Sequence, residues 1–232
     1  FQALLGDGGQ WGLSIAYAVQ PSPDGIAQAF HIGADFIAGQ KCALILGDNI
    51  FYGHGLTDAL ARASSQVSGA TIFTHAVKDP ERFGVVSFDS AGNPTDIVEK
   101  PAKPNSNWAV TGLYFYDKDV ADIAAKLKPS QRGEFEITDV NRAYLERGAL
   151  RAERLGRGFC WFDAGTHDAL LDAGNFVRGV EQGQSHRIAC LEEIAFRKGW
   201  IESQRLEDLV ARLGSNAYGS YLQRILESPD DA

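Results

Sequence analysis

The positions of apolar residues along the chain predict strands that alternate with helices. Short apolar runs between turn residues indicate strands, and apolar residues that recur every three or four positions indicate helices. On this basis we expect strands at residues 11–20, 42–46, 70–77, 84–88, 96–99, 109–116, 150–155 and 160–162. We expect helices at residues 56–66, 118–127, 136–146, 168–181, 191–198, 206–213 and 218–226, and an earlier helix that begins near Ser22 and Gly25. This order predicts an α/β sheet followed by a helical carboxyl-terminal appendage.

The strand patterns stop near residue 170, and this change indicates a division of the chain. We expect a core at residues 1–170 and a helical tail at residues 171–232. The tail would supply surface for a second binding site and for contacts between subunits.

Two aspartates follow predicted strands. Asp48 comes after the apolar run 42–46, and Asp163 comes after the run 160–162. The first run is continuously apolar, as in a parallel strand covered on both faces, so we expect both carboxylates at the carboxyl edge of one sheet. Mg²⁺ in proteins binds one or two carboxylates together with water and phosphate oxygens, so the pair predicts a magnesium site for phosphate chemistry. The alternative, two ordinary aspartates that cap turns, is open at this point.

Other polar residues at predicted strand ends are suited to a nucleotide or a sugar phosphate. Gln20 offers a side-chain amide to a planar base, and Gly25 leaves room for a ligand beside the backbone. Lys100 suits a phosphate, Glu99 suits sugar hydroxyls, and Arg132 suits a phosphate clamp. Each also has a structural alternative. Gln20 and Gly25 can belong to a simple helix start, and Glu99 and Lys100 to a solvated turn. Arg132 can be an exposed surface arginine.

Glycines lie beside aromatic residues in two further segments. Phe83 precedes Gly84, and Gly112 lies in the segment Trp108–Tyr114. Such surfaces can hold a sugar ring against backbone amides, although aromatic residues in strands are also simply core.

Composition excludes several classes of protein. The 232 residues carry a net charge of −8, which argues against a nucleic-acid partner because such binding requires many lysines and arginines. No run approaches the roughly 18 apolar residues of a membrane span, and the chain does not open with a signal-peptide pattern. Cys42, Cys160 and Cys190 have no CxxC spacing and are expected to be reduced thiols. These features predict a cytoplasmic protein with no membrane partner.

Six segments occur in a fixed order along nearly the whole chain: QPSPDGIAQAF at 20–30, LGDNIFYGH at 46–54, DPERFGV at 79–85, EKP at 99–101, NWAVTGLYFYD at 107–117 and DAGTH at 163–167. Together they closely resemble the glucose-1-phosphate thymidylyltransferases (dTDP-glucose pyrophosphorylases), a family of sugar nucleotidyltransferases. Each segment alone is weak, whereas the combination is highly specific. The resemblance implies a Rossmann-like mixed sheet flanked by helices as the nucleotidyltransferase core.

The resemblance also implies a reaction. dTTP and α-D-glucose 1-phosphate would react in a Mg²⁺-dependent step to give dTDP-glucose and pyrophosphate. This is the first step toward dTDP-L-rhamnose, a route that belongs to lipopolysaccharide and O-antigen biosynthesis, and the family suggests a homotetramer. Two alternatives stay open: uridylyl or adenylyl transfer to a sugar 1-phosphate, and a non-catalytic sensor of nucleotide sugars.

The matching motifs imply roles for individual residues. In the catalytic set, Asp48 and Asp163 would hold Mg²⁺, and Lys100 and Arg132 would bind the sugar phosphate. The residues implied to contact the rest of the substrates are Gln20 and Gly25 for the thymine and Phe83, Gly84, Glu99 and Val110 for the glucosyl part. Phe83 stands where the family usually has tyrosine. A second, regulatory site, where dTDP-rhamnose would bind as an inhibitor, is implied by matches at Gly53, Arg157, Glu193, Ile194 and Arg197.

The front of the chain departs from the family pattern. The family begins with a strand and a Gly-rich GXGTRL loop that wraps the triphosphate, and the first residues here do not match them. We therefore expect the amino terminus to be incomplete by roughly sixty residues, about two βα units. Loss of a central strand would expose backbone groups and apolar faces, so this chain expressed alone is expected to be insoluble or inactive.

Overall fold

The computed structural model describes residues 1–228, and contacts group the chain into two compact units. One unit spans residues 19–173 and contains every strand of the described chain. The other unit joins residues 1–18 to the chain from residue 174 onward. The functional division at residue 170 stays a prediction.

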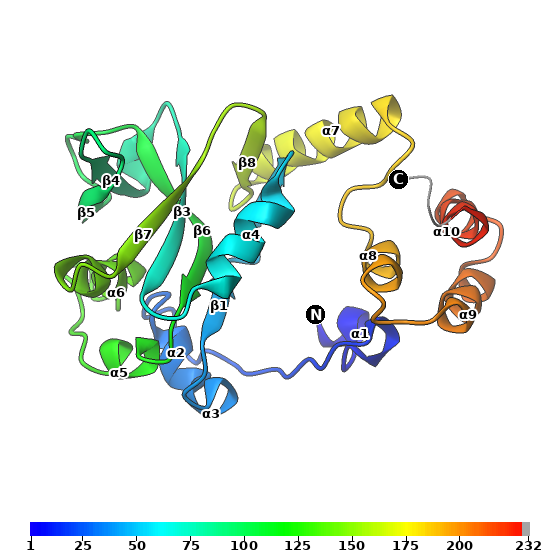
Figure 1. Ribbon diagram of the computed structural model, residues 1–232, viewed down its shortest axis with the longest axis horizontal. Coiled ribbons are helices and arrows are strands. Elements are labelled where there is room, and N and C mark those ends of the chain that lie inside the picture. The colour runs from blue at the N-terminus through cyan, green and yellow to red at the C-terminus, as the bar shows by residue number, and fades with distance from the viewer. Residues whose placement is uncertain (229–232) are drawn as a thin grey trace. The chain divides into compact units, whose positions relative to one another are not determined.

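A six-stranded mixed sheet forms the centre of the unit 19–173 (Figure 1). Its strands are β1 (Cys42–Ile45), β3 (Ala70–Ala76), β4 (Gly84–Phe88), β5 (Pro94–Glu99), β6 (Trp108–Tyr116) and β7 (Leu150–Leu155). The order is β5-β4-β6-β3-β7, and β1 also pairs with β6. Within residues 1–228 only β3 and β7 run parallel, and the other neighbours are antiparallel. The predicted α/β fold with a mixed sheet is confirmed.

Strands β1 and β4 pair with β6 at different points along its length. β1 lies opposite residues 113–116 of β6, and β4 lies opposite Trp108 and Ala109. Residues 110–112 lie between these two pairings, where β1 and β4 part. Ligands in α/β sheets bind at such a divergence of neighbouring strands, because it leaves open space beside the strand ends.

The prediction of a parallel, doubly covered strand at 42–46 was wrong. β1 is antiparallel to β6, and Ile45 is 60% exposed. Its side chains alternate between half-buried and exposed positions, so only one face of β1 packs on the core. A run of five apolar residues fits a one-sided antiparallel strand as well as a buried parallel one.

Helices cover both faces of the sheet. On one face α2 (Gln28–Ile32), α5 (Val120–Ala124) and α6 (Ile137–Glu146) share a core with Ile72 and Tyr116. On the other face α4 (Leu56–Ser65) packs through Ala59 and Ala63 against Phe73 and Leu113. Neighbouring residues of β6 therefore point to opposite cores, as the two-residue period of a strand requires.

A second, two-stranded sheet begins directly after Asp48 and ends at Asp163, so the two predicted metal ligands do not share the carboxyl edge of one sheet as expected. β2 (Asn49–Gly53) runs antiparallel to β8 (Phe159–Asp163), and Asn49 lies opposite Asp163. The sequence analysis predicted β8 but not β2. Turn residues flank the three apolar residues 50–52 on both sides. A run of three residues is too short to show the alternation of apolar and polar positions that indicates a strand.

The strand predicted at residues 11–20 was also wrong. The segment begins with the 3-10 helix η1 (Gly9–Trp11) and continues without regular structure. Trp11 is buried in the helical unit, whereas Val19 is 86% exposed. Alternating apolar residues form a strand only beside another strand, and this segment has none within the described chain.

The helix expected to begin near Ser22 begins later, at Gln28, and breaks at Gly33 before α3 (Ala34–Ile37). The segment ahead of it pairs with the backbone of Phe135 instead. Phe135 N–H donates to Asp24 O at 2.7 Å, and Ala27 N–H donates to Phe135 O at 3.1 Å. This pairing holds residues 24–27 outside a helix, and α2 begins directly after it.

The second unit is helical. It contains α1 (Gln2–Leu5), η1, α8 (Leu191–Arg197), α9 (Ser203–Leu213) and α10 (Ala217–Glu227), and α7 (His167–Gly183) leads into it. Trp11, Leu206 and Leu222 lie in its core. The predicted helices from residue 168 onward are confirmed, apart from shifts of a few residues at their ends. No helix within residues 1–228 combines the length and the apolar character needed to cross a membrane.

Candidate active site

A cavity of about 290 Å³ opens where β1 and β4 part along β6. Its lining includes seven residues that the sequence analysis singled out: Asp48, Phe83, Gly84, Glu99, Lys100, Val110 and Asp163. The structure therefore gathers residues that lie more than one hundred positions apart in the sequence. Polar or aromatic groups also come from residues that were not predicted, namely Asn49, Arg82, Thr138 and Trp161.

The carboxylates of Asp48 and Asp163 lie close together at the start of β2 and the end of β8. Ala164 N–H donates to Asp48 O at 2.8 Å, which joins the two segments. Asp48 Oδ2 and Asp163 Oδ1 each lie 3.4 Å from the point that a Cβ on Gly165 would occupy. The two oxygens are therefore within twice that distance of each other, and the absent side chain of Gly165 leaves the space beside them open.

Asn49 connects this carboxylate pair to the two sheets. Its Nδ2 donates to Asp48 Oδ1 at 2.8 Å. Its Oδ1 accepts from Trp161 Nε1 at 2.6 Å and from Gly112 N–H at 3.1 Å. Asn49 was not predicted to be a site residue, although its place directly after Asp48 was the available signal.

The turn after β5 holds Lys100 in an unusual backbone conformation. Its φ is 40°, in the left-handed region that residues other than glycine rarely adopt. Lys100 N–H donates to Phe83 O at 3.0 Å, which fixes the turn against the start of β4. Glu99, the last residue of β5, accepts a hydrogen bond from Thr138 Oγ1. Backbone strain of this kind clusters at ligand sites, so the turn supports a binding role for this edge of the cavity.

Arg132 lies among three carboxylates. Its guanidinium nitrogens are 2.7 Å from Glu134, 3.5 Å from Glu136 and 3.6 Å from Glu99. Burial raises the pKa of the Glu136 carboxyl, and the negative charge of Glu99 raises it further. A hydrogen bond from Ser130 acts in the opposite direction but does not cancel the rise. Arg132 does not line the cavity, but Glu99 does. A phosphate that binds Arg132 must therefore compete with these carboxylates.

Gln20 and Gly25 lie next to each other but outside the cavity lining, to which their neighbour Ile26 belongs. Gln20 Nε2 donates to Gly25 O at 3.2 Å and to Gln28 Oε1 at 2.6 Å. Gly25 has a φ of 107°, and a Cβ at this position would lie 2.4 Å from Phe135 O. The backbone of Phe135 alone thus requires a glycine here, and contact with a base stays a prediction.

The residues predicted for a regulatory site are divided between the two units. Gly53 and Arg157 belong to the unit 19–173, and the other three lie on α8 of the helical unit. On α8 the structure pairs Arg197 Nε with Glu193 Oε1 at 2.8 Å, and Glu193 also accepts from Tyr221. A regulatory role for the set stays a prediction.

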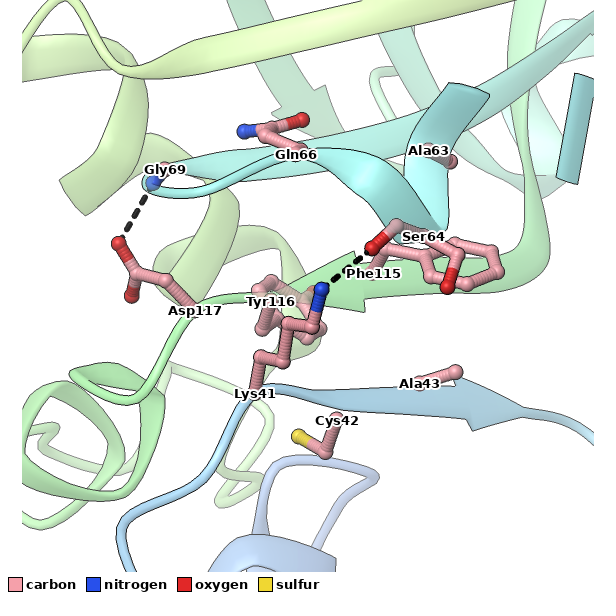
Figure 2. A pocket seen from close by; sticks show the side chains of 10 residues that line it. All are labelled: Lys41, Cys42, Ala43, Ala63, Ser64, Gln66, Gly69, Phe115, Tyr116 and Asp117. Atoms are coloured by element: carbon pink, nitrogen blue, oxygen red, sulfur yellow. Dashed lines mark hydrogen bonds between the residues drawn. The ribbon is translucent and has the colours of Figure 1, made fainter. Parts of the chain in front are cut away.

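A smaller cavity of about 160 Å³ lies at the other end of β1 and β6 (Figure 2). Lys41 Nζ donates to Ser64 O at 2.7 Å, and Asp117 accepts from Gly69 N–H and Tyr144. Burial alone would raise the pKa of the Asp117 carboxyl, but hydrogen bonds from Tyr144 and from backbone amides lower it. These polar groups are occupied by hydrogen bonds within the protein, and the volume is little more than half that of the cavity beside β1 and β4. The larger cavity is therefore the candidate active site.

Comparison with known proteins agrees with this assignment. The family model described as nucleotidyl transferase matches residues 1–179. The chain belongs to the nucleotidyl transferase family. Among similar members, the glucose-1-phosphate thymidylyltransferase of Xanthomonas campestris pv. campestris (strain B100) is 59% identical over 96% of this chain and 75% of its own. The enzyme of the same name from Neisseria meningitidis is 55% identical over 98% of this chain and 79% of its own.

A solved structure supports the fold of this nucleotidyl transferase. It is a Bacillus anthracis protein described as a glucose-1-phosphate thymidylyltransferase, in complex with a sucrose. It is 41% identical, has a TM-score of 0.69 and covers 76% of this chain and 70% of its own. The resemblance inferred from the six sequence segments is confirmed at the level of the family.

Proposed function

We propose that this nucleotidyl transferase moves a thymidylyl group from dTTP to α-D-glucose 1-phosphate. The observation that carries the proposal is the convergence of Asp48 and Asp163 on one cavity, which the strained turn at Lys100 also lines. Two carboxylates and a lysine suit a reaction between two phosphate compounds. The similar proteins named glucose-1-phosphate thymidylyltransferase supply the choice of base and sugar.

The carboxylate pair fits a Mg²⁺ ion. Asp48 and Asp163 would hold it, with water and phosphate oxygens as the remaining ligands. The open space left by Gly165 lies against one oxygen of each carboxylate, where an added Cβ would stand in contact with both. Among residues 1–228 no group of three or more histidine, cysteine or acidic residues is arranged to hold a metal. When bound, the ion would neutralise charge on the phosphates.

The protein's own residues would then act by binding and orientation. An oxygen of the sugar phosphate attacks the α-phosphorus of dTTP, the bond to the β-phosphate breaks, and pyrophosphate leaves. Lys100 would bind the sugar phosphate, and so would Arg132 once it leaves its carboxylate partners. Glu99, already oriented by Thr138, would accept hydrogen bonds from the sugar hydroxyls. Gln20 and Gly25 would face the thymine, and no protein nucleophile is needed.

The direct test measures pyrophosphate release by the full-length gene product. We expect release with dTTP and glucose 1-phosphate, and much less with UTP or ATP. A clear preference for UTP would indicate uridylyl transfer instead, and a clear preference for ATP would indicate adenylyl transfer. Binding of dTDP-rhamnose without any turnover would indicate a nucleotide-sugar sensor instead.

Replacement of Gly165 by alanine tests the space beside the carboxylates. Its φ lies outside the left-handed region, and an added Cβ would reach Asp48 and Asp163 at 3.4 Å without a backbone clash. We therefore expect Gly165→Ala to keep the melting temperature within about 3 °C, equivalent to roughly 1 kcal/mol. The methyl group would stand against the two oxygens that would hold the ion, so half-saturation by Mg²⁺ should need at least tenfold more metal. Unchanged Mg²⁺ dependence in a titration of activity would show that the ion binds elsewhere.

The finer parts of the sequence interpretation are also proposals. They comprise the place in the route to dTDP-L-rhamnose, feedback inhibition by dTDP-rhamnose, a cytoplasmic location and a homotetramer. The resemblance to the family supports them. A gel-filtration mass of four chains and a loss of turnover with dTDP-rhamnose are the expected results.

A further inference from the structure

The three hydrogen bonds of Asn49 fix the orientation of its amide group. The carbonyl oxygen faces two N–H donors, from Trp161 and Gly112. The opposite orientation would place the NH₂ group against these donors and the carbonyl oxygen against a carboxylate. The hydrogen-bonding partners therefore allow one orientation only, and it directs the NH₂ group to Asp48 Oδ1.

This orientation divides the two oxygens of Asp48 between different tasks. Oδ1 is occupied by Asn49 at 2.8 Å. Oδ2 is the oxygen that lies 3.4 Å from the Cβ point of Gly165, on the same open space as Asp163 Oδ1. A carboxylate that accepts a hydrogen bond on one oxygen has its rotation restricted and presents the other oxygen to a cation.

The groups that hold Asn49 are themselves parts of the two sheets. Trp161 lies on β8 and Gly112 on β6, 112 and 63 residues from Asn49 along the chain. A Cβ on Gly112 would lie 2.7 Å from Asn49 Cγ, so the amide rests directly on bare backbone. The side chain is thus held by β-structure on two sides, as an orienting group must be.

We propose that Asn49 is a positioning residue of the transfer reaction, which holds Asp48 with Oδ2 toward the cation and toward Asp163. This inference rests on the proposed function and deepens it. Groups that orient metal ligands typically contribute 10- to 100-fold to metal affinity. The effect of Asn49 on the metal should therefore exceed its effect on folding.

The test measures Mn²⁺ binding to the full-length protein by electron paramagnetic resonance, together with the melting temperature. Asn49→Ala is expected to weaken Mn²⁺ binding at least tenfold. Trp161→Phe removes one of the two donors that fix the Asn49 amide but keeps Gly112 and the hydrogen bond to Asp48, so the loss of Mn²⁺ affinity should be clearly smaller than in Asn49→Ala. Asn93→Ala is the matched control, because Asn93 donates to Asp89 at 3.0 Å in a surface turn away from the cavity. It should bind Mn²⁺ like the wild type.

A second variant serves if Asn49→Ala does not fold. Asn49→Asp keeps the shape and the oxygen that accepts from Trp161 and Gly112, but it turns a second carboxylate oxygen toward Asp48 Oδ1. We expect kcat at saturating Mg²⁺ to fall at least tenfold. Wild-type Mn²⁺ affinity in Asn49→Ala, equal losses in Asn49→Ala and Trp161→Phe, or wild-type kcat in Asn49→Asp would each overturn the proposal. An inactive wild type that does not bind Mn²⁺ would instead contradict the proposed function.

Discussion

Asp48→Asn is expected to lower kcat by about a thousandfold, on the order of 4 kcal/mol of transition-state stabilisation. The substitution keeps the size and the carbonyl-type oxygen that accepts from Asn49, but it removes the negative charge that would attract Mg²⁺. Asp48 is exposed, so the free energy of unfolding should change by no more than about 0.5 kcal/mol. Steady-state assays of the full-length protein and thermal unfolding measure the two effects separately.

Asp58→Asn provides a matched control for this loss of one charge. Asp58 is also exposed, and it lies on α4, outside the lining of the cavity. Its activity should equal that of the wild type. If Asp48→Asn keeps more than a tenth of wild-type kcat, Asp48 does not hold the metal.

Gly25→Ala is expected to destabilise the unit that contains the cavity by about 2 kcal/mol or more. The φ of 107° is costly for alanine, and the added Cβ would lie 2.4 Å from Phe135 O and 2.6 Å from Phe135 N. Backbone atoms cannot rotate away, so the hydrogen bonds that join Phe135 to Asp24 and Ala27 would have to break. We expect the melting temperature to fall by about 5 °C or more.

Gly179→Ala separates this effect from the general consequence of replacing a glycine. Gly179 lies within α7, its φ is not positive, and an added Cβ would meet no atom within 4 Å. Alanine in a helix is favoured over glycine, so this variant should be as stable as the wild type or more stable. A Gly25→Ala protein with a wild-type melting temperature would contradict the close approach of Phe135.

Most of the core elements could be predicted from the sequence because the spacing of their apolar residues has the period of a strand or of a helix. β4 and β7 have the predicted bounds, and α4 differs by one residue. The failures occur where a neighbour decides the structure. β2 forms because β8 lies beside it, and residues 11–20 form no strand because no strand pairs with them in the described chain. Local patterns carry no information about such partners.

The same distinction applies to the candidate site. The sequence correctly indicated that Asp48 and Asp163 come together, and motif order indicated the family. The expectation that they share the carboxyl edge of one sheet was wrong, because β1 belongs to the six-stranded sheet and β8 to the two-stranded sheet. The amide of Asn49 could not be assigned, because its partners Trp161 and Gly112 become neighbours only in the folded sheets. The carboxylates around Arg132 were missed for a different reason. Two of them lie within four residues of Arg132, but their approach depends on the turn formed by residues 130–134.

The most direct test of the shared metal site is the anomalous scattering of Mn²⁺ in crystals of the full-length protein grown with the ion. A single strong peak is predicted beside Gly165, about 2.1 Å from Asp48 Oδ2 and from Asp163 Oδ1. A peak that contacts only one of these carboxylates, or a peak at another place in the molecule, would contradict the account.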